Sequence, residues 1–119
     1  MPDRFVILEH RQECSHWDVM LERGETLRTW AVDAPLSVGK TLPGQPLPDH
    51  RRVYLDYEGP ISGDRGEVRR VVAGTYATLE WSDDRIVVIL SSPQLTGELM
   101  LTREGGGTWS LRLAPGNVD

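Results

Sequence analysis

The stretch RFVILEHRQECSHWDVMLE, residues 4–22, contains two apolar runs separated by the polar segment 11–15. In the second run the side chains alternate. Positions 16, 18, 20 and 22 are His, Asp, Met and Glu, whereas positions 17, 19 and 21 are Trp, Val and Leu. A period of two is typical of a β-strand that buries one face. The apolar face of residues 16–22 is therefore expected to belong to the core.

Short runs of the same kind recur along the chain. They cover residues 27–32, 51–57, 67–81, 85–92, 97–103 and 108–114, and segments such as SDD and REGGG separate them. No long stretch shows the apolar spacing of an amphipathic helix. Short strands with tight connections predict an all-β fold, as a barrel or a sandwich, and closure would remove exposed sheet edges. We expect a closed antiparallel β-barrel of about eight short strands, with long loops and at most short helices.

The chain has 119 residues, and we expect a single domain over residues 1–119. Residues 33–49 form the one long segment without a strand pattern, and they hold four of the eight prolines. Within them, APLSVGKT (34–41) matches a relaxed phosphate-loop pattern. That chemistry needs a helix starting at the lysine, which the prolines at 43, 46 and 48 forbid. We predict an ordinary surface loop.

Composition restricts the classes of function. A net charge of −5 argues against a nonspecific nucleic-acid coat, which is normally basic. It is compatible with a local arginine cluster that binds one phosphate, although the pairs Arg51–Arg52 and Arg69–Arg70 also suit solvated strand edges. A single cysteine excludes an internal disulfide. With neither a signal peptide nor a membrane-spanning run in evidence, we expect no membrane association and a cytoplasmic location.

His10, His16 and Asp18 are candidate metal ligands. A strand places His16 and Asp18 on one face, and a hairpin turn at residues 11–15 would bring His10 beside them. Two imidazoles and a carboxylate suit Mn²⁺, Zn²⁺ or Fe²⁺ with open coordination positions. The alternatives are surface histidines without a metal, or a closed zinc site with Cys14 as fourth ligand.

His50, Arg52 and Tyr54 are candidate phosphate contacts. If residues 51–57 form a strand, alternation from His50 puts all three on one face. Arg52 would supply charge, and His50 and Tyr54 would supply hydrogen-bond donors. The alternative is a solvent-facing side of that strand.

Taken together, the blocks RFVILEH, HWDVMLE, TWAVDAP, DHRRVYLDYEGP and LTGELMLTR resemble the phosphoesterase domain of bacterial DNA ligase D and its small stand-alone relatives. The resemblance runs over nearly the whole chain. It implies a β-barrel enzyme that uses Mn²⁺ (or Zn²⁺ or another divalent ion) at His10, His16 and Asp18. His50 and Tyr54 would engage the scissile phosphate.

The same resemblance implies a reaction and its partners. The substrates would be DNA 3′ ends, including ends tipped with RNA, from which a 3′-ribonucleoside or a 3′-phosphate is removed during end joining. A separate ligase or polymerase is an expected partner, and we expect a monomer. The alternative is a metal-binding barrel with weakened or lost catalysis that acts as a nucleic-acid or protein binding module.

Met20 is the main departure from the family pattern, which has a phosphate-contacting arginine there. Methionine cannot donate to an oxyanion, and the loss of one such contact typically costs about 10²–10³ in rate. Leu8 and Pro48 also replace a family glutamine and glutamate. Arg52 or Arg28 would have to serve instead, and Met20→Arg is predicted to raise the rate.

Overall fold

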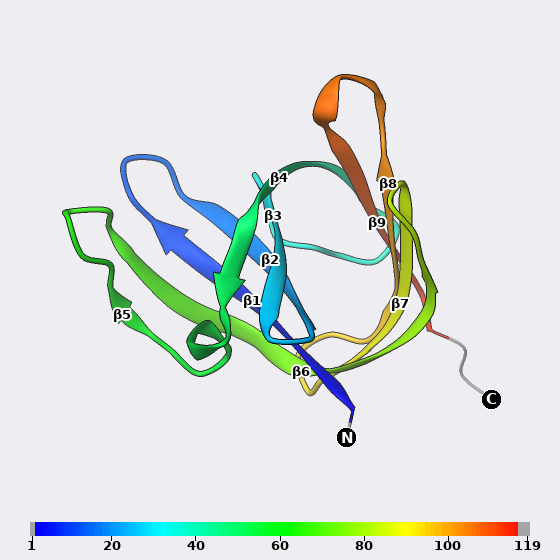
Figure 1. Ribbon diagram of the computed structural model, residues 1–119, viewed down its shortest axis with the longest axis horizontal. Helices are drawn as coiled ribbons and strands as arrows, with labels where there is room; N and C mark the ends of the chain where they lie inside the picture. The colour runs from blue at the N-terminus through cyan, green and yellow to red at the C-terminus, as the bar shows by residue number, and fades with distance from the viewer. Residues whose placement is uncertain (1, 117–119) are drawn as a thin grey trace.

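The computed structural model describes residues 2–116, and its β-strands close into an antiparallel barrel (Figure 1). The barrel strands are β1 (Asp3–Arg11), β2 (His16–Arg23), β3 (Thr26–Val32), β4 (Thr41–Arg51), β6 (Glu67–Trp81), β7 (Arg85–Ser91), β8 (Gly97–Arg103) and β9 (Trp109–Ala114). They follow the order β1-β2-β3-β4-β9-β8-β7-β6, and pairing of β6 with β1 closes the ring. The predicted fold class is confirmed.

Three short elements complete the chain. The two-residue strand β5 (Gly59–Pro60) pairs with the start of β6. The 3₁₀ helices η1 (Arg52–Leu55) and η2 (Gly105–Gly107) are single turns. Neither helix in the range 2–116 has the length or apolar content needed to cross a bilayer.

The predicted strand positions are wrong in one region. Residues 33–49 are irregular only as far as Lys40, because β4 begins at Thr41. The expected strand at 51–57 is instead η1 and a turn. The segment 34–41 leads into β4 and starts no helix, as predicted for an ordinary loop.

The prolines of β4 are tolerated because the two neighbours of this strand cover different parts of it. Strand β9 pairs with Thr41–Gly44, whereas β3 pairs with Gly44–Arg51. Gly44 is the only described residue of β4 that pairs with both neighbours, so each proline lies where one side of the strand is unpaired. An open edge does not require the missing backbone N–H. A proline-rich segment can therefore complete the barrel.

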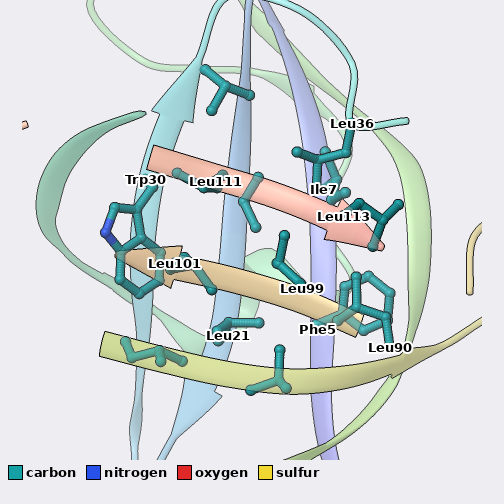
Figure 2. Packing of buried hydrophobic residues seen from close by; sticks show 14 of the residues in the cluster. Phe5, Ile7, Leu21, Trp30, Leu36, Leu90, Leu99, Leu101, Leu111 and Leu113 are labelled. Atoms are coloured by element: carbon teal, nitrogen blue, oxygen red, sulfur yellow. The ribbon is translucent and has the colours of Figure 1, made fainter. Parts of the chain in front are cut away.

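Apolar side chains from all eight barrel strands fill the barrel interior. Figure 2 shows part of this packing. Its largest fully buried member is Trp30, and the Trp109 ring meets it edge-on at 5.5 Å. The labelled members of this interior cluster are Phe5, Ile7, Leu21, Trp30, Leu36, Leu90, Leu99, Leu101, Leu111 and Leu113.

A second, smaller apolar cluster lies on the opposite face of strands β6, β1, β2 and β3. Its buried members are Val6, Leu8, Met20, Leu27, Leu55 and Val68. Leu55 comes from η1, which therefore covers this outer face. Alternation along β1 and β2 explains the division, because neighbouring residues point to opposite sides of the sheet. We call this the outer cluster.

Candidate functional site

The β1–β2 hairpin brings the three predicted ligands together on the outer face. His10 and His16 are directly opposite each other in the pairing register, and their ring centroids lie 4.7 Å apart. Asp18 follows two residues later on the same face. One nitrogen of each histidine and one oxygen of Asp18 all lie within 4.8 Å of one another. The predicted hairpin thus produces a compact group of two imidazoles and one carboxylate.

A backbone carbonyl outside the group sets the tautomer of His10. The His10 Nε2 atom lies 2.6 Å from the carbonyl oxygen of Arg65. A carbonyl can only accept, so Nε2 carries the proton and Nδ1 keeps its lone pair. Nδ1 lies 3.9 Å from Asp18 Oδ2, on the side of the carboxylate. Backbone carbonyls orient metal-binding histidines in the same way.

Asp18 is a buried carboxylate with an unsatisfied oxygen. Its exposed fraction is 3%, and Oδ1 has no hydrogen-bond partner among the described residues. His16 Nε2 comes within 3.1 Å of Oδ1, but the two atoms are not aligned for a hydrogen bond. Burial raises the pKa of Asp18, and the nearby histidines His16, His10 and His50 oppose that rise. Converging lone pairs around a buried carboxylate fit a divalent cation.

A cavity of about 110 Å³ adjoins this group. His10, Asp18, His50, Tyr54 and Arg65 supply its polar wall, and members of the outer cluster form its apolar wall. The His50 and Tyr54 rings meet edge-to-face at 5.7 Å. His50 Nδ1 donates to the Pro48 carbonyl at 2.8 Å, which leaves Nε2 as its second hydrogen-bonding atom. The cavity therefore combines two of the candidate ligands, His10 and Asp18, with a tyrosine hydroxyl and an imidazole nitrogen that can form further hydrogen bonds.

Comparison with known proteins places this arrangement in a family. The family model for the DNA ligase D 3′-phosphoesterase domain matches residues 8–103, a range that contains every residue of the cavity. The chain belongs to the DNA ligase D 3′-phosphoesterase domain family.

Curated relatives agree with this assignment. The multifunctional non-homologous end joining protein LigD of Mycobacterium bovis is 32% identical over 88% of the chain. LigD proteins of Mycobacterium tuberculosis and Mycolicibacterium smegmatis are 32% and 30% identical over 88% and 90% of the chain. The chain spans only 15–16% of the length of these relatives.

Two arginines expected to contact phosphate in this phosphoesterase domain are engaged elsewhere. Arg52 lies in η1, not in a strand, and its guanidinium is 2.6 Å from Glu22. Glu22 also accepts from the backbone N–H of Arg4, so it has a structural role. Arg28 stacks over Trp30 at 4.9 Å and lies 3.8 Å from Asp49. Neither arginine lines the cavity, and placing Arg52 on the face of His50 and Tyr54 was wrong.

Arg65 is the arginine that lines the cavity, and the sequence reasoning missed it. It lies in the loop between β5 and β6, where Gly63, Asp64 and Gly66 all adopt positive φ. A Cβ atom on Gly66 would come within 1.9 Å of the Arg11 carbonyl oxygen, so glycine is needed to dock the loop on β1. The glycine-rich segment SGDRG was the available signal, but its partner strand is distant in sequence.

Met20 and Cys14 take different positions relative to the cavity. Met20 lines it but is only 1% exposed, because most of its surface packs in the outer cluster. Cys14 is exposed in the β1–β2 turn and does not belong to the group of candidate ligands. The structure thus supports three candidate ligands without a fourth from the cysteine.

Proposed function

We propose that this chain is a metal-dependent phosphoesterase that processes 3′ ends of DNA in non-homologous end joining. The observation that carries the proposal is the buried Asp18 carboxylate, one oxygen of which accepts no aligned hydrogen bond from the described residues, facing two histidines beside a cavity in a member of this family. Homology supports a role in end processing. The substrates proposed are a 3′-terminal ribonucleoside and a 3′-phosphate, and the proposed partner is a separate ligase or polymerase.

His10, His16 and Asp18 would hold the cation, with Mn²⁺ the first choice and Zn²⁺ the second. His10 Nδ1 and His16 Nε2 are the nitrogens that lie toward the Asp18 carboxylate. When bound, the ion would supply a Lewis acid that stabilises negative charge on the phosphoryl group. The hydrogen bond to the Arg65 carbonyl keeps His10 in the tautomer that this role requires.

His50 and Tyr54 would bind the phosphate and assist departure of the leaving group. In the hydrolysis, the attacking water gives up a proton as its oxygen bonds to phosphorus, the bond from phosphorus to the departing oxygen breaks, and the departing oxygen takes up a proton. The Tyr54 hydroxyl is the proton donor nearest to this role. His50 also lines the cavity, and its Nε2 would donate only when the imidazole carries a second proton, because Nδ1–H is bonded to the Pro48 carbonyl. Arg65, which lines the cavity, would have the phosphate-binding role that the sequence analysis gave to Arg52.

A binding module without catalysis is the second candidate function. The observation that favours it is Met20, an uncharged side chain on the cavity wall where the family resemblance calls for an arginine. In this case the barrel would bind a metal and a 3′ end without turnover.

A 3′-end processing assay distinguishes the two candidates. Wild-type protein with Mn²⁺ is mixed with a primer-template that ends in a ribonucleotide or in a 3′-phosphate, and the products are separated by length and charge. Mn²⁺-dependent shortening or dephosphorylation is expected. No turnover at high enzyme concentration, with metal shown to be bound, would support the binding module.

Metal analysis of variants tests the site itself. His16→Ala should lose the ion, whereas Cys14→Ala, an exposed change in the same hairpin turn, should retain it. Unchanged stoichiometry in His16→Ala would reject this site.

Met20→Arg tests the missing arginine. A higher rate is expected if the new guanidinium reaches the cavity, and thermal unfolding must first show that the variant is folded, because position 20 is buried. An unchanged rate in a folded variant would mean that another group, such as Arg65, already binds the phosphate.

A further inference from the structure

A cleft lies next to the cavity that adjoins the candidate metal ligands. Its volume is about 410 Å³, which is typical of ligand sites. Tyr54, Ile61 and Arg65 line both the cleft and the cavity, so the two spaces share a wall. Arg51, Tyr57 and Ser62 line the cleft alone. The chain therefore offers a binding surface that continues outward from the candidate phosphate site.

The cleft is positively charged although the chain as a whole is acidic. Arg51 and Arg65 line it, and no carboxylate does. Seven arginines form ion pairs in the described part of the chain, namely Arg4, Arg11, Arg28, Arg52, Arg70, Arg85 and Arg103. Within residues 2–116, no Asp or Glu lies within ion-pair distance of Arg51 or Arg65. Two guanidinium groups that line one cleft without a carboxylate partner favour an anionic ligand.

Hydrogen bonds within the loop orient the Arg65 side chain. Its Nε donates to the Ser62 carbonyl at 2.8 Å, and one terminal nitrogen lies 3.3 Å from Ser62 Oγ. These bonds use one edge of the guanidinium. The other terminal nitrogen retains both of its N–H donors for a ligand. A guanidinium anchored on one side is suited to bind a phosphate on the other.

Tyrosine rings give the cleft an aromatic wall. Tyr54 and Tyr57 meet edge-to-face, with centroids 5.8 Å apart. The Tyr57 hydroxyl donates to the Pro60 carbonyl, which fixes that ring against β5. Val53, 55% exposed, adds apolar surface at the same place. Aromatic rings beside arginines are the combination that binds bases and phosphates of an unpaired strand.

We propose that this cleft binds the nucleotide adjoining the scissile phosphate, with Arg65 at that phosphate and Arg51 at the next one. The sugar or base would lie against Tyr54 and Tyr57. The proposal rests on the proposed function for the position of the scissile phosphate. It assigns substrate binding to Arg51, Arg65 and Tyr57, in addition to the three metal ligands.

Equilibrium binding of an oligonucleotide tests the cleft without requiring turnover. A fluorescein-labelled single-stranded oligodeoxynucleotide with a 3′-phosphate is titrated with the full chain in EDTA, and anisotropy is recorded at several salt concentrations. Arg51→Ala and Arg65→Ala should each weaken binding about tenfold. Each should also reduce the slope of log K against log salt by about 0.7–1, because one phosphate contact is lost.

Matched variants control for charge and for folding. Arg103→Ala removes the same charge at the β8–β9 end, far from η1 in Figure 1, and should change neither the affinity nor the slope. Tyr57→Leu should weaken binding about tenfold, whereas Tyr57→Phe keeps the ring and most of the affinity. Thermal unfolding confirms that each variant is folded.

The outcomes separate this inference from the proposed function. If Arg51→Ala and Arg65→Ala bind like Arg103→Ala, the cleft is not the nucleotide site, even if Mn²⁺-dependent hydrolysis is observed. If the cleft variants lose binding as expected but the wild type shows no hydrolysis, the nucleotide site stands and the proposed catalysis fails.

Discussion

The interior of the barrel and its outer face use the same strands for different purposes. The interior cluster draws apolar residues from all eight barrel strands, and none of its members carries a charge. The outer cluster has six buried members from four strands and η1, and it borders Asp18 and the candidate ligand His10. One face of the β1–β2 hairpin therefore supports the fold, and the other carries the candidate chemistry.

This division has a physical reason. A charged or polar group in a closed apolar interior would lose its hydration without compensation, at a cost of several kcal/mol. On the outer face a thin apolar layer holds the side chains in place while the cavity remains accessible to a ligand. Strand alternation lets a single hairpin meet both requirements. Substitutions on each face test how independent the two faces are.

The largest effect on stability is expected when a buried leucine is replaced by alanine, once on each face. Leu101 is in the interior cluster and Leu27 is in the outer cluster, and both are fully buried. Leu101→Ala should lower the free energy of unfolding by about 3–5 kcal/mol, and Leu27→Ala by about 2–3 kcal/mol, because the outer layer can collapse into the space. Denaturant unfolding measures both. Equal losses would show that the outer cluster is as tightly constrained as the interior.

Tyr76 links the interior cluster to the backbone of β2 through its hydroxyl group. Its ring packs in the interior, its hydroxyl donates to the Glu22 carbonyl, and burial raises its pKa to about 12. The neutral form is thus favoured in the folded state. Burial of neutral Tyr76 adds to the free energy of unfolding. This stabilisation is complete below the unfolded pKa of about 10 and is lost as pH rises toward 12, a loss of about 2–3 kcal/mol.

Unfolding at several pH values checks this expectation. The stability of the wild type should fall faster than that of Tyr76→Phe between pH 10 and pH 12. Parallel curves would show that Tyr76 ionises equally easily in the folded and unfolded states.

Asp18 is expected to reduce the stability of the metal-free protein. A buried carboxylate with an unsatisfied oxygen is costly, so Asp18→Asn should stabilise the metal-free chain by about 1–2 kcal/mol. Added Mn²⁺ should raise the melting temperature of the wild type and not that of the variant. Asp49→Asn, which changes an exposed carboxylate, is the control and should have little effect. A less stable Asp18→Asn would indicate that Asp18 is a structural group.

The smallest effect concerns the attachment of η1 to the barrel. Arg4 lies 2.7 Å from Asp56 and holds the pKa of that carboxyl below its usual value. The contribution is present above the unfolded pKa of about 3.9 and is lost as pH falls below it. Both side chains are exposed, so Asp56→Asn should cost at most about 1 kcal/mol at pH 7 and nothing at pH 2. A difference that persists at pH 2 would assign another role to Asp56.

Much of the candidate site could be predicted because it is local. Alternation over residues 16–22 separates His16 and Asp18 from the core residues Val19 and Leu21, and a short turn is enough to place His10 opposite His16. These relations depend only on strand geometry within one hairpin. The association of His50 with Tyr54 was also predicted, although the expected strand is a 3₁₀ turn.

The remaining features depend on contacts between distant parts of the chain. Strand β4 was missed because proline disfavours strands in general, and only the staggered pairing with β3 and β9 leaves the prolines at open edges. Arg65 was missed because its loop reaches the site by docking on β1, 55 residues from His10.

The sequence by itself determined the all-β class and the grouping of His10, His16 and Asp18, because both follow from short-range periodicity. Only the tertiary structure decided which arginine lines the cavity, since Arg52 is bound by Glu22 while Arg65 is not paired with any described carboxylate. The residues that line the cavity come from segments distant in sequence, so closure of the barrel decides which residues these are.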